Sequence, residues 1–271
     1  MKRQTGNHLA RREAAKTEPS PITALRDLLA TAFAADVAAI TPMVCDVLRE
    51  GISELAVPAR RDLIRRAHQT LVSKAGALPM DVAQEFRARF DVRLHAATGS
   101  VPGRYRPDGA NLALMDETLL ELDIALDQCA ARLKEQTSVE MFQLTARVSA
   151  MLGKPSLDDA ENPIAPRVFA CTLMDALGKM DFGSEQCLAV FKAFGPPMLY
   201  IASDLYNHAN ALLAECGVLP EFKARYGDPL SQPALPARRP VLPDERTLAA
   251  VLDRLLQGHR ARGDGLAGIA L

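Results

Sequence analysis

One long apolar stripe at helical spacing constrains the fold of this chain more than any other feature. Most of its members follow one another at steps of three or four residues, which places them along one side of an α-helix. Such a side must be buried against other helices, so the stripe predicts an all-α protein built by helix packing. Its members are Met115, Leu119, Leu122, Leu126, Cys129, Leu133, Met141, Leu144, Val148 and Met151.

The spacing of this stripe slips between Leu133 and Met141, where Thr137 occupies the position expected for an apolar residue. A slip of this kind indicates either a stutter within one helix or a break between two helices. The sequence alone leaves both possibilities open.

Composition places the chain among globular proteins with enough apolar material for a core. Of its 271 residues, 48% are hydrophobic and 24% are charged, and the formal net charge is −1. That charge gives no bulk attraction to nucleic acid or to a membrane. The five cysteines are widely separated, which predicts reduced, buried thiols. With no secretory pattern and no apolar run that approaches the length of a membrane span, we expect a cytoplasmic protein.

Prolines and glycines divide the first part of the chain into predicted segments. Residues 1–20 are polar and basic, and we expect them to form a disordered arm. An N-terminal helical region follows at 21–97, in which Pro42 is expected either to kink the first helix or to divide it in two. A loop rich in glycine and proline, at 98–110, ends this region.

The second part continues the alternation of helices and breaks. The run Gly195-Pro196-Pro197 predicts the end of one helix, with another helix beginning directly after it. The expected architecture is an irregular multi-helix bundle with a tethered C-terminal helix. Its remaining segments are a helical bundle domain at 111–226, a proline-rich linker at 227–243, an amphipathic helix at 244–262 and a tail at 263–271.

No known catalytic or metal-binding pattern occurs in the sequence. Zinc-ligand spacings, a calcium loop, phosphate-binding glycine loops and a serine elbow are all missing. Asp204, His208 and Cys216 lie one and two helical turns apart, so they are the first candidates for a site assembled from distant residues. A histidine packed in the core explains His208 more simply. We therefore predict no enzyme activity, no metal and no cofactor, with a helical enzyme around Asp204 and His208 as an alternative.

Charge is unevenly distributed although the total is near zero. Residues 58–106 carry ten basic and four acidic side chains, whereas residues 111–162 carry four basic and ten acidic ones. These surfaces could be solvated or could pair with each other in the fold. A second possibility is a basic surface for an acidic partner, including nucleic acid. The residues that would form this surface are Arg60, Arg61, Arg65 and Arg66.

The predicted helix at 244–262 is the best candidate for a partner-binding element. An amphipathic helix on a proline-rich tether can dock on its own chain, on a second copy or on another protein. Its compact apolar face consists of Leu248, Val251, Leu252, Leu255 and Leu256.

The stretch from Asn162 to Phe222 resembles a block in a proteobacterial family called domain of unknown function 1631. The block begins with Asn-Pro-x-x-Pro, continues with helices, and closes with Gly-Val-Leu-Pro. The preceding helices, from about Leu119, resemble the family more loosely. The matching residues here are Asn162, Pro163, Pro166, Phe194, Leu205, Tyr206, Asn210, Ala211, Leu212, Leu213, Gly217, Val218, Leu219 and Pro220.

The resemblance implies a helical regulatory or scaffolding region without a known catalytic site. Long members of the family end in a PilZ-like β-barrel that is associated with cyclic di-GMP. We expect no such barrel here, because the chain stops soon after the proline-rich linker, and its nucleotide-binding motif is missing. The resulting hypothesis is a cytoplasmic protein for protein–protein interaction or regulation, which binds a partner or self-associates.

Overall fold

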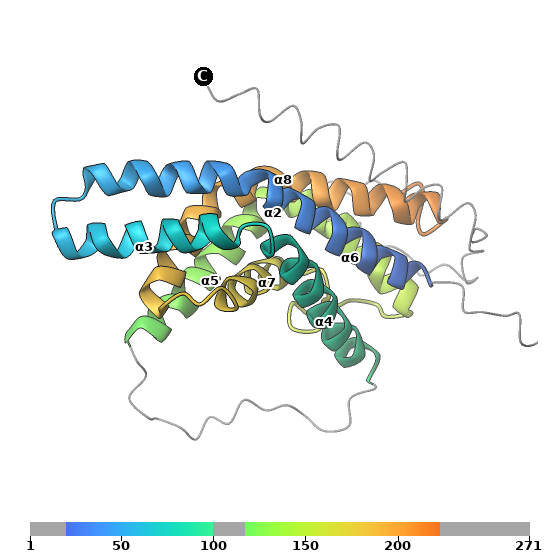
Figure 1. Cartoon of the computed structure of the whole chain (residues 1–271). Helices are drawn as coiled ribbons and strands as arrows, with labels where there is room; N and C mark the ends of the chain where they lie inside the picture. The colour runs from blue at the N-terminus through green and yellow to red at the C-terminus, as the bar shows by residue number, and fades with distance from the viewer. Residues whose placement is uncertain (1–19, 100–116, 223–271) are drawn as a thin grey trace, which may run out of the picture.

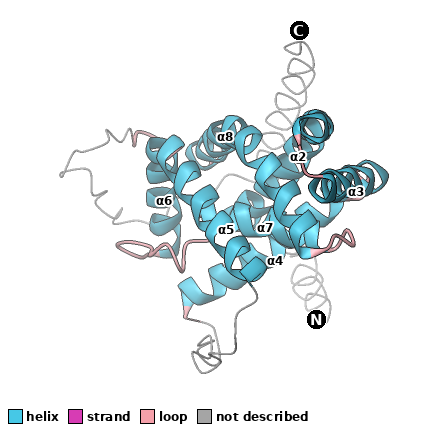
Figure 2. Ribbon diagram, turned by 90° about the vertical axis from the view of Figure 1, so that its left-hand side faces the viewer, coloured by secondary structure: helices cyan, strands magenta, loops and turns pink. Residues whose placement is uncertain are grey.

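The computed structural model describes residues 20–99 and 117–222. Within these ranges every regular element is a helix and no strand occurs, which confirms the prediction of an all-α fold. The helices form an elongated bundle (Figure 1, Figure 2). They are α2 (Pro21–Glu54), α3 (Pro58–Lys74), α4 (Leu78–Thr98), α5 (Glu117–Gln136), α6 (Ser138–Leu152), α7 (Pro166–Gly178) and α8 (Ser184–Glu215).

Two helices connect the early and late parts of the chain. Helix α2 packs against α3, α4 and α8, and the short helix α7 packs against α4, α5 and α8. Figure 2 shows α7 in the interior of the bundle, surrounded by longer helices. Helices from residues 20–99 and helices from residues 117–222 therefore contribute side chains to one hydrophobic core.

Residues at the helix ends explain where the helices begin and stop. The Ser20 hydroxyl accepts a hydrogen bond from the amide of Thr23 at 3.3 Å, and Pro21 occupies the first turn of α2. Gly99 and Gly153 follow α4 and α6 with φ of +70° and +66°. These left-handed conformations close both helices and favour glycine.

Helix α2 continues through Pro42 as a single helix. Its axis changes direction partway along (Figure 1), so of the two sequence-based possibilities a bend is observed and a division is not. The Thr41 hydroxyl donates to the Val37 carbonyl at 2.6 Å, an arrangement that bends helices. Buried Ile40 and Val44 lie on either side of the proline, and their packing holds both halves in the core.

The expectation that no apolar run approaches the length of a membrane span is wrong for α2. Residues Pro21–Ser53 form a helix of sufficient length, with a mean hydropathy of 1.8 in its most apolar window. That window is 56% buried inside the bundle, and a core helix meets the same criterion of length and composition. In the bundle, the apolar side of α2 contacts α3, α4 and α8.

The apolar stripe that begins at Met115 belongs to two helices, because α5 ends at Gln136 and α6 begins at Ser138. Thr137 lies between them, fully buried, and its hydroxyl donates to the Leu133 carbonyl at 2.7 Å. Of the two possibilities left by the sequence, the break is observed. Cys129, Leu133, Leu144 and Val148 are buried, and Leu122, Leu126, Met141 and Met151 pack partly buried against the core. Met115 and the side chain of Leu119 lie outside the described residues.

The prediction that Gly195-Pro196-Pro197 ends a helix is wrong. Helix α8 runs through all three residues. Each proline lacks an amide donor, so the carbonyls of Lys192 and Ala193, one turn earlier, lose their helical partners. Buried residues on both sides of the run outweigh this local cost. They are Phe191, Phe194, Met198 and Ile201.

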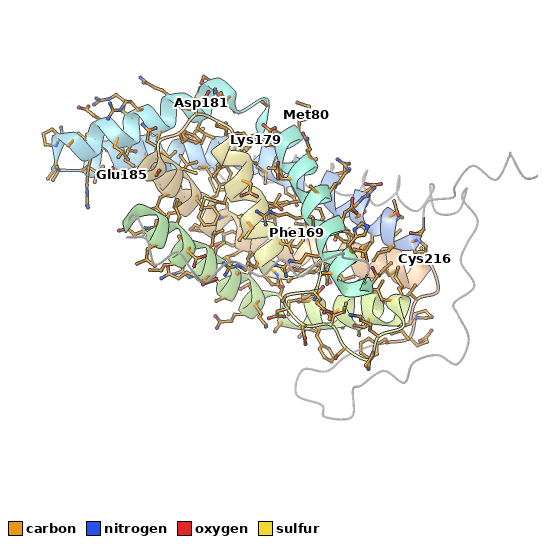
Figure 3. The ribbon with its side chains drawn as sticks, turned by 90° about the horizontal axis from the view of Figure 1, so that it is seen from below. Met80, Phe169, Lys179, Asp181, Glu185 and Cys216 are labelled. Atoms are coloured by element: carbon orange, nitrogen blue, oxygen red, sulfur yellow. The ribbon has the colours of Figure 1, made fainter. Side chains whose placement is uncertain are left out.

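An aromatic cluster lies where α2, α4, α7 and α8 meet. The ring of Phe169 on α7 is 5.2 Å from that of Phe33, 5.0 Å from that of Phe86 and 5.6 Å from that of Tyr206, measured between centroids. Figure 3 shows Phe169 near the middle of the bundle. The Tyr206 hydroxyl donates to the Ile164 carbonyl at 2.8 Å, so this buried polar group is satisfied.

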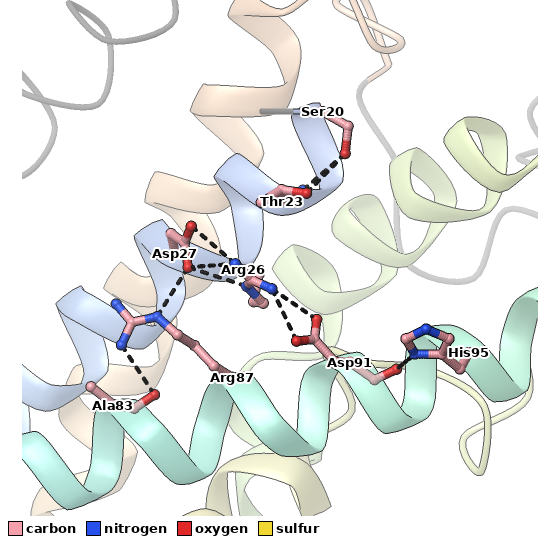
Figure 4. A network of polar contacts seen from close by, with 8 residues as sticks. All are labelled: Ser20, Thr23, Arg26, Asp27, Ala83, Arg87, Asp91 and His95. Atoms are coloured by element: carbon pink, nitrogen blue, oxygen red, sulfur yellow. Dashed lines mark hydrogen bonds and ion pairs between the residues drawn. The ribbon is translucent and has the colours of Figure 1, made fainter. Parts of the chain in front are cut away.

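Helices α2 and α4 are also joined by crossed ion pairs (Figure 4). Arg26 of α2 donates to both carboxylate oxygens of Asp91 on α4, at 3.1 and 2.9 Å. In return, Arg87 of α4 donates to Asp27 of α2 at 3.0 Å. These groups are partly exposed, so each pair stabilises the fold by no more than about 1 kcal/mol. They join two adjacent residues of α2 to two residues of α4 that lie one turn apart.

Candidate functional site

The four arginines predicted to form a basic surface lie on α3, but the structure uses two of them locally. Arg61 donates from Nε to the Leu55 carbonyl at 2.6 Å, which holds the corner between α2 and α3. Arg65 pairs with Asp62 one turn earlier on the same helix. Arg60 and Arg66 are exposed. Arg61 keeps its charge, because its acceptor is a neutral carbonyl, and only Arg65 of the four has a carboxylate partner among the described residues.

Other basic residues of the 58–106 segment are tied to α7 and the turn that follows it. Arg89 pairs with Asp175 of α7, and Lys74 pairs with Asp181. In one further pair the turn supplies the basic residue and α4 the acidic one: Lys179 is 2.7 Å from the Glu85 carboxylate. Figure 3 shows Lys179 and Asp181 close to the first turn of α4.

The acidic segment 111–162 also finds its partners mainly elsewhere than in the basic segment. Arg167 of α7 pairs with Asp123 at 2.9 Å and with Asp127, both on α5. Arg93 of α4 does reach the acidic segment, but it donates to the Asp159 carbonyl at 2.7 Å, and not to a carboxylate. Helix α7 thus forms ion pairs with both the basic and the acidic segment. Among the described residues, no ion pair joins the two segments directly.

Asp204, His208 and Cys216 lie along α8 and the turn after it, as their spacing predicts. Asp204 and His208 are half-buried, and Cys216 is buried. Burial raises the pKa of the Cys216 thiol, and the nearby Glu215 carboxylate raises it further. A nucleophilic cysteine needs a lowered pKa, so the environment of Cys216 is opposite to that requirement. No group of three or more potential metal ligands occurs among residues 20–99 and 117–222.

We expect the buried thiols to react slowly in the native protein. Burial raises the pKa of Cys129 and of Cys187 from 9.0 to about 11, so at pH 8 the thiolate fraction falls roughly a hundredfold. Iodoacetamide labelling followed by peptide mass spectrometry should therefore modify half-buried Cys171 before Cys129 and Cys187. In denaturant all three should react at similar rates. Native labelling of Cys129 as fast as in denaturant would contradict this assignment.

A groove runs along α8 on the surface of the bundle. Its first part, of about 520 Å³, lies between α3, α8 and the start of α5. Its second part, of about 250 Å³, lies between α5 and α8. Lys192 lines both, so the two parts adjoin, and we refer to them together as the α8 groove. It extends along α8 from Glu185 to Leu199, a distance of about 21 Å.

The α8 groove has an apolar floor and charged edges. Its floor and walls include the buried or half-buried side chains of Ile64, Leu188, Cys129, Phe191 and Leu199. The charged side chains, all exposed, are Arg60, Glu121 and Glu185 at one end, Arg132 at the other end and Lys192 between them. Leu120 and Ile124 of α5 are also exposed, by 48% and 46%. They lie within one helical turn of Glu121.

Sequence reasoning did not find this groove, although it singled out residues that shape it. Gly195 and Pro196 line the second part. A Cβ added at Gly195 would meet nothing within 4 Å, so the missing side chain leaves open space beside α5. The glycine and prolines were interpreted as a helix end. Their observed effect is a hollow in the side of a continuous helix.

The polar residues that carry the family resemblance stabilise the fold. Asn162 accepts from the Ile164 amide at 3.1 Å and donates to the Thr145 hydroxyl at 3.1 Å. Asn210 donates to the Glu140 carbonyl at 2.8 Å and accepts from the buried guanidinium of Arg147 at 2.6 Å. These contacts join α6, α8 and the loop before α7. These hydrogen bonds give Asn162 and Asn210 a structural role in the fold.

The apolar face predicted at Leu248, Val251, Leu252, Leu255 and Leu256 lies outside the described residues, as do the basic arm, the proline-rich linker and the tail.

Comparison with known proteins agrees with the resemblance and extends it. Residues 17–217 match the family described as "Protein of unknown function (DUF1631) N-terminal domain". The match includes α2, α3 and α4, which lie before the part of the chain where the resemblance was noted. No curated protein and no solved structure matches the chain. Because the matched region covers well over half of the sequence, this chain belongs to the DUF1631 family.

Proposed function

We propose that this protein is a cytoplasmic protein–protein interaction protein with a regulatory or scaffolding role, and that the α8 groove is its binding surface. The observation that carries the proposal is the combination of an apolar floor, charged edges and a length of about four helical turns. These are the properties of a surface that receives the apolar face of an amphipathic helix.

The size of the groove supports a peptide-like ligand over a small metabolite. Small-molecule sites are typically concave and enclose most of the ligand surface. The α8 groove is long and open along the side of the bundle, and its charged residues are exposed at the edges. A helix that lies in it can pair with these charges at its ends while its leucines contact the floor.

Substitution of Gly195 by arginine provides the test. Apart from its two chain neighbours, nothing lies within 4 Å of the added Cβ, so the arginine side chain should fill the second part of the groove. Because Gly195 precedes Pro196 inside α8, circular dichroism should first show that the variant keeps its helix content. Gly178→Arg is the matched control, because Gly178 also has open space at its Cβ and lies at the end of α7, outside the groove.

We expect Gly195→Arg to lower the recovery of a specific bound protein at least about tenfold, which corresponds to the loss of about 1.4 kcal/mol of binding free energy. Gly178→Arg should leave recovery unchanged. The measurement is capture by the full chain and quantitative mass spectrometry. Equal sets of captured proteins for the wild type and both variants would count against the groove as the binding surface.

A further inference from the structure

We propose that the α8 groove is occupied by residues 244–262 of the same chain, docked as an amphipathic helix that runs antiparallel to α8. The inference rests on the proposed function of the groove as a helix-binding surface. It adds the identity of the occupant, its direction and a regulatory consequence.

The length of the linker favours an intramolecular occupant. The described chain ends at Phe222, just after α8, and Figure 3 shows Glu185 and Cys216 at opposite ends of that helix. From the end of α8 back to Leu199, the near end of the groove, is about 24 Å. The 21 residues from 223 to 243 span about 25 Å on average if flexible and about 65 Å if extended as polyproline.

The match between the average span of the linker and the distance to the groove determines the effective concentration of the segment at the groove. A tether whose average span matches the distance gives an effective concentration in the millimolar range. A second copy of the chain at about 1 µM would be roughly a thousandfold more dilute. The same tether also sets the direction, because residue 244 must enter at the Leu199 end.

The charges of the segment and the groove match in this direction and not in the reverse one. Asp244 and Glu245, which outnumber Arg246 at the start of the segment, would lie near Arg132 and Lys192. Arg260 and Arg262 at its end would lie near Glu121 and Glu185, which outnumber Arg60 there. Acidic residues at the start and basic residues at the end also complement the dipole of the docked helix.

The dimensions match as well. From residue 244 to residue 260 a helix rises about 24 Å, close to the length of about 21 Å between Leu199 and Glu185. The leucines and valine of the segment recur at helical spacing and would contact the apolar floor. Gln257 lies on the opposite side of the predicted helix from Leu252.

Docking of this kind would make the segment an autoinhibitory element. Another protein could then use the groove only by displacing residues 244–262. Its apparent affinity would be reduced by the ratio of docked to undocked chain.

A zero-length cross-link between Lys192 and the segment tests the occupant directly. Carbodiimide joins an amine to a carboxylate that it contacts, and the carboxylates of the segment are those of Asp244, Glu245 and Asp253. We expect the full chain at about 1 µM to give a peptide that joins Lys192 to one of these residues. In a mixture of isotope-labelled and unlabelled chains, the cross-linked peptides should be fully labelled or fully unlabelled, which shows that they form within one chain.

Two single substitutions that add the same charge provide the comparison. Leu252→Asp puts a carboxylate on the apolar face and should lower the docked-to-undocked ratio at least about a hundredfold, so the cross-link should disappear. Gln257→Asp adds the carboxylate on the opposite side and should leave the cross-link in place. Leu252→Asp should also increase capture of any protein that competes for the groove.

The proposal is overturned if wild-type chain gives no Lys192 cross-link to the segment, if the link survives Leu252→Asp, or if it forms only between chains. Capture that depends on Gly195 without such a cross-link would overturn this inference and leave the proposed function standing. A cross-link with the expected response to Leu252→Asp would support the inference, even where no captured protein depends on Gly195.

Discussion

Replacing Phe169 with alanine is expected to lower the free energy of unfolding by about 3–5 kcal/mol. The ring of Phe169 contacts those of Phe33, Phe86 and Tyr206, which come from three other helices. Its removal would leave a cavity where α2, α4, α7 and α8 meet, because the surrounding backbone cannot close on it from all sides. Urea unfolding followed by circular dichroism measures the change.

Tyr200→Ala is the matched control for this substitution. Tyr200 is an aromatic residue on α8, but its side chain is 80% exposed. Its removal should therefore change the free energy of unfolding by no more than about 0.5 kcal/mol. Equal effects of the two substitutions would show that the aromatic cluster is not a centre of the core.

The second large effect is expected at Asn210. This side chain accepts from the Arg147 guanidinium at 2.6 Å and donates to the Glu140 carbonyl at 2.8 Å. Arg147 is only 4% exposed, and its burial lowers the pKa of the guanidinium. No carboxylate pairs with it in the described part of the chain. Asn210→Ala should therefore cost about 3 kcal/mol, since it leaves a buried charge and a half-buried carbonyl short of partners.

Asn210→Ala should also have a local effect, on the turn that follows α8, in addition to its effect on the free energy of unfolding. Arg147 also donates to the carbonyls of Leu219 and Phe222, at 3.4 and 3.3 Å, and so holds the turn that follows α8. Hydrogen exchange at the Val218 amide, which donates to Leu213, should speed up in Asn210→Ala. Asn207→Ala makes the same change at an exposed position one turn earlier. If it destabilises the protein equally, the loss comes from helix α8 itself and not from the contact with Arg147.

A double substitution tests whether the cost of Asn210→Ala arises from the buried charge of Arg147. Arg147→Met removes the buried cation that Asn210 serves, so the cost of Asn210→Ala should be smaller in that background. Additive effects of the two substitutions would show that Asn210 and Arg147 stabilise the protein independently.

Local patterns in the sequence correctly predicted the helices and several of their ends. The stripe through Cys129 and Leu144 predicted buried helix faces, because apolar residues at steps of three or four have no other way to leave water together. Pro21 and Gly99 mark helix ends for reasons internal to the backbone. Such signals do not depend on which other helices surround them.

The same local rules were wrong at Gly195-Pro196-Pro197 and left the outcome open at Pro42. A proline removes one hydrogen bond from a helix, and this cost can be exceeded by side chains buried on both sides. Whether those side chains find a core depends on the other helices. The amount of burial at Phe191 and Met198 could not be known from the local sequence.

The candidate site also combines features that local sequence patterns predict with features that depend on tertiary packing. The spacing of Arg60, Arg61, Arg65 and Arg66 predicted a basic surface, and the structure adds the local partners of two of them: Arg61 donates to the Leu55 carbonyl and Arg65 pairs with Asp62. The α8 groove joins residues from α3, α5 and α8 that are far apart in the sequence. No pattern within one segment carries information about such a meeting.

By itself, the sequence determined that this chain folds as helices, which sides of them are apolar and to which family it belongs, because these properties depend on short-range periodicity and on motifs read along the chain. Only the tertiary structure decided that α8 continues through its two prolines, that α7 lies between the basic and acidic segments, and that a groove opens beside Gly195. These features depend on packing between distant segments, and packing energy is set by which surfaces meet.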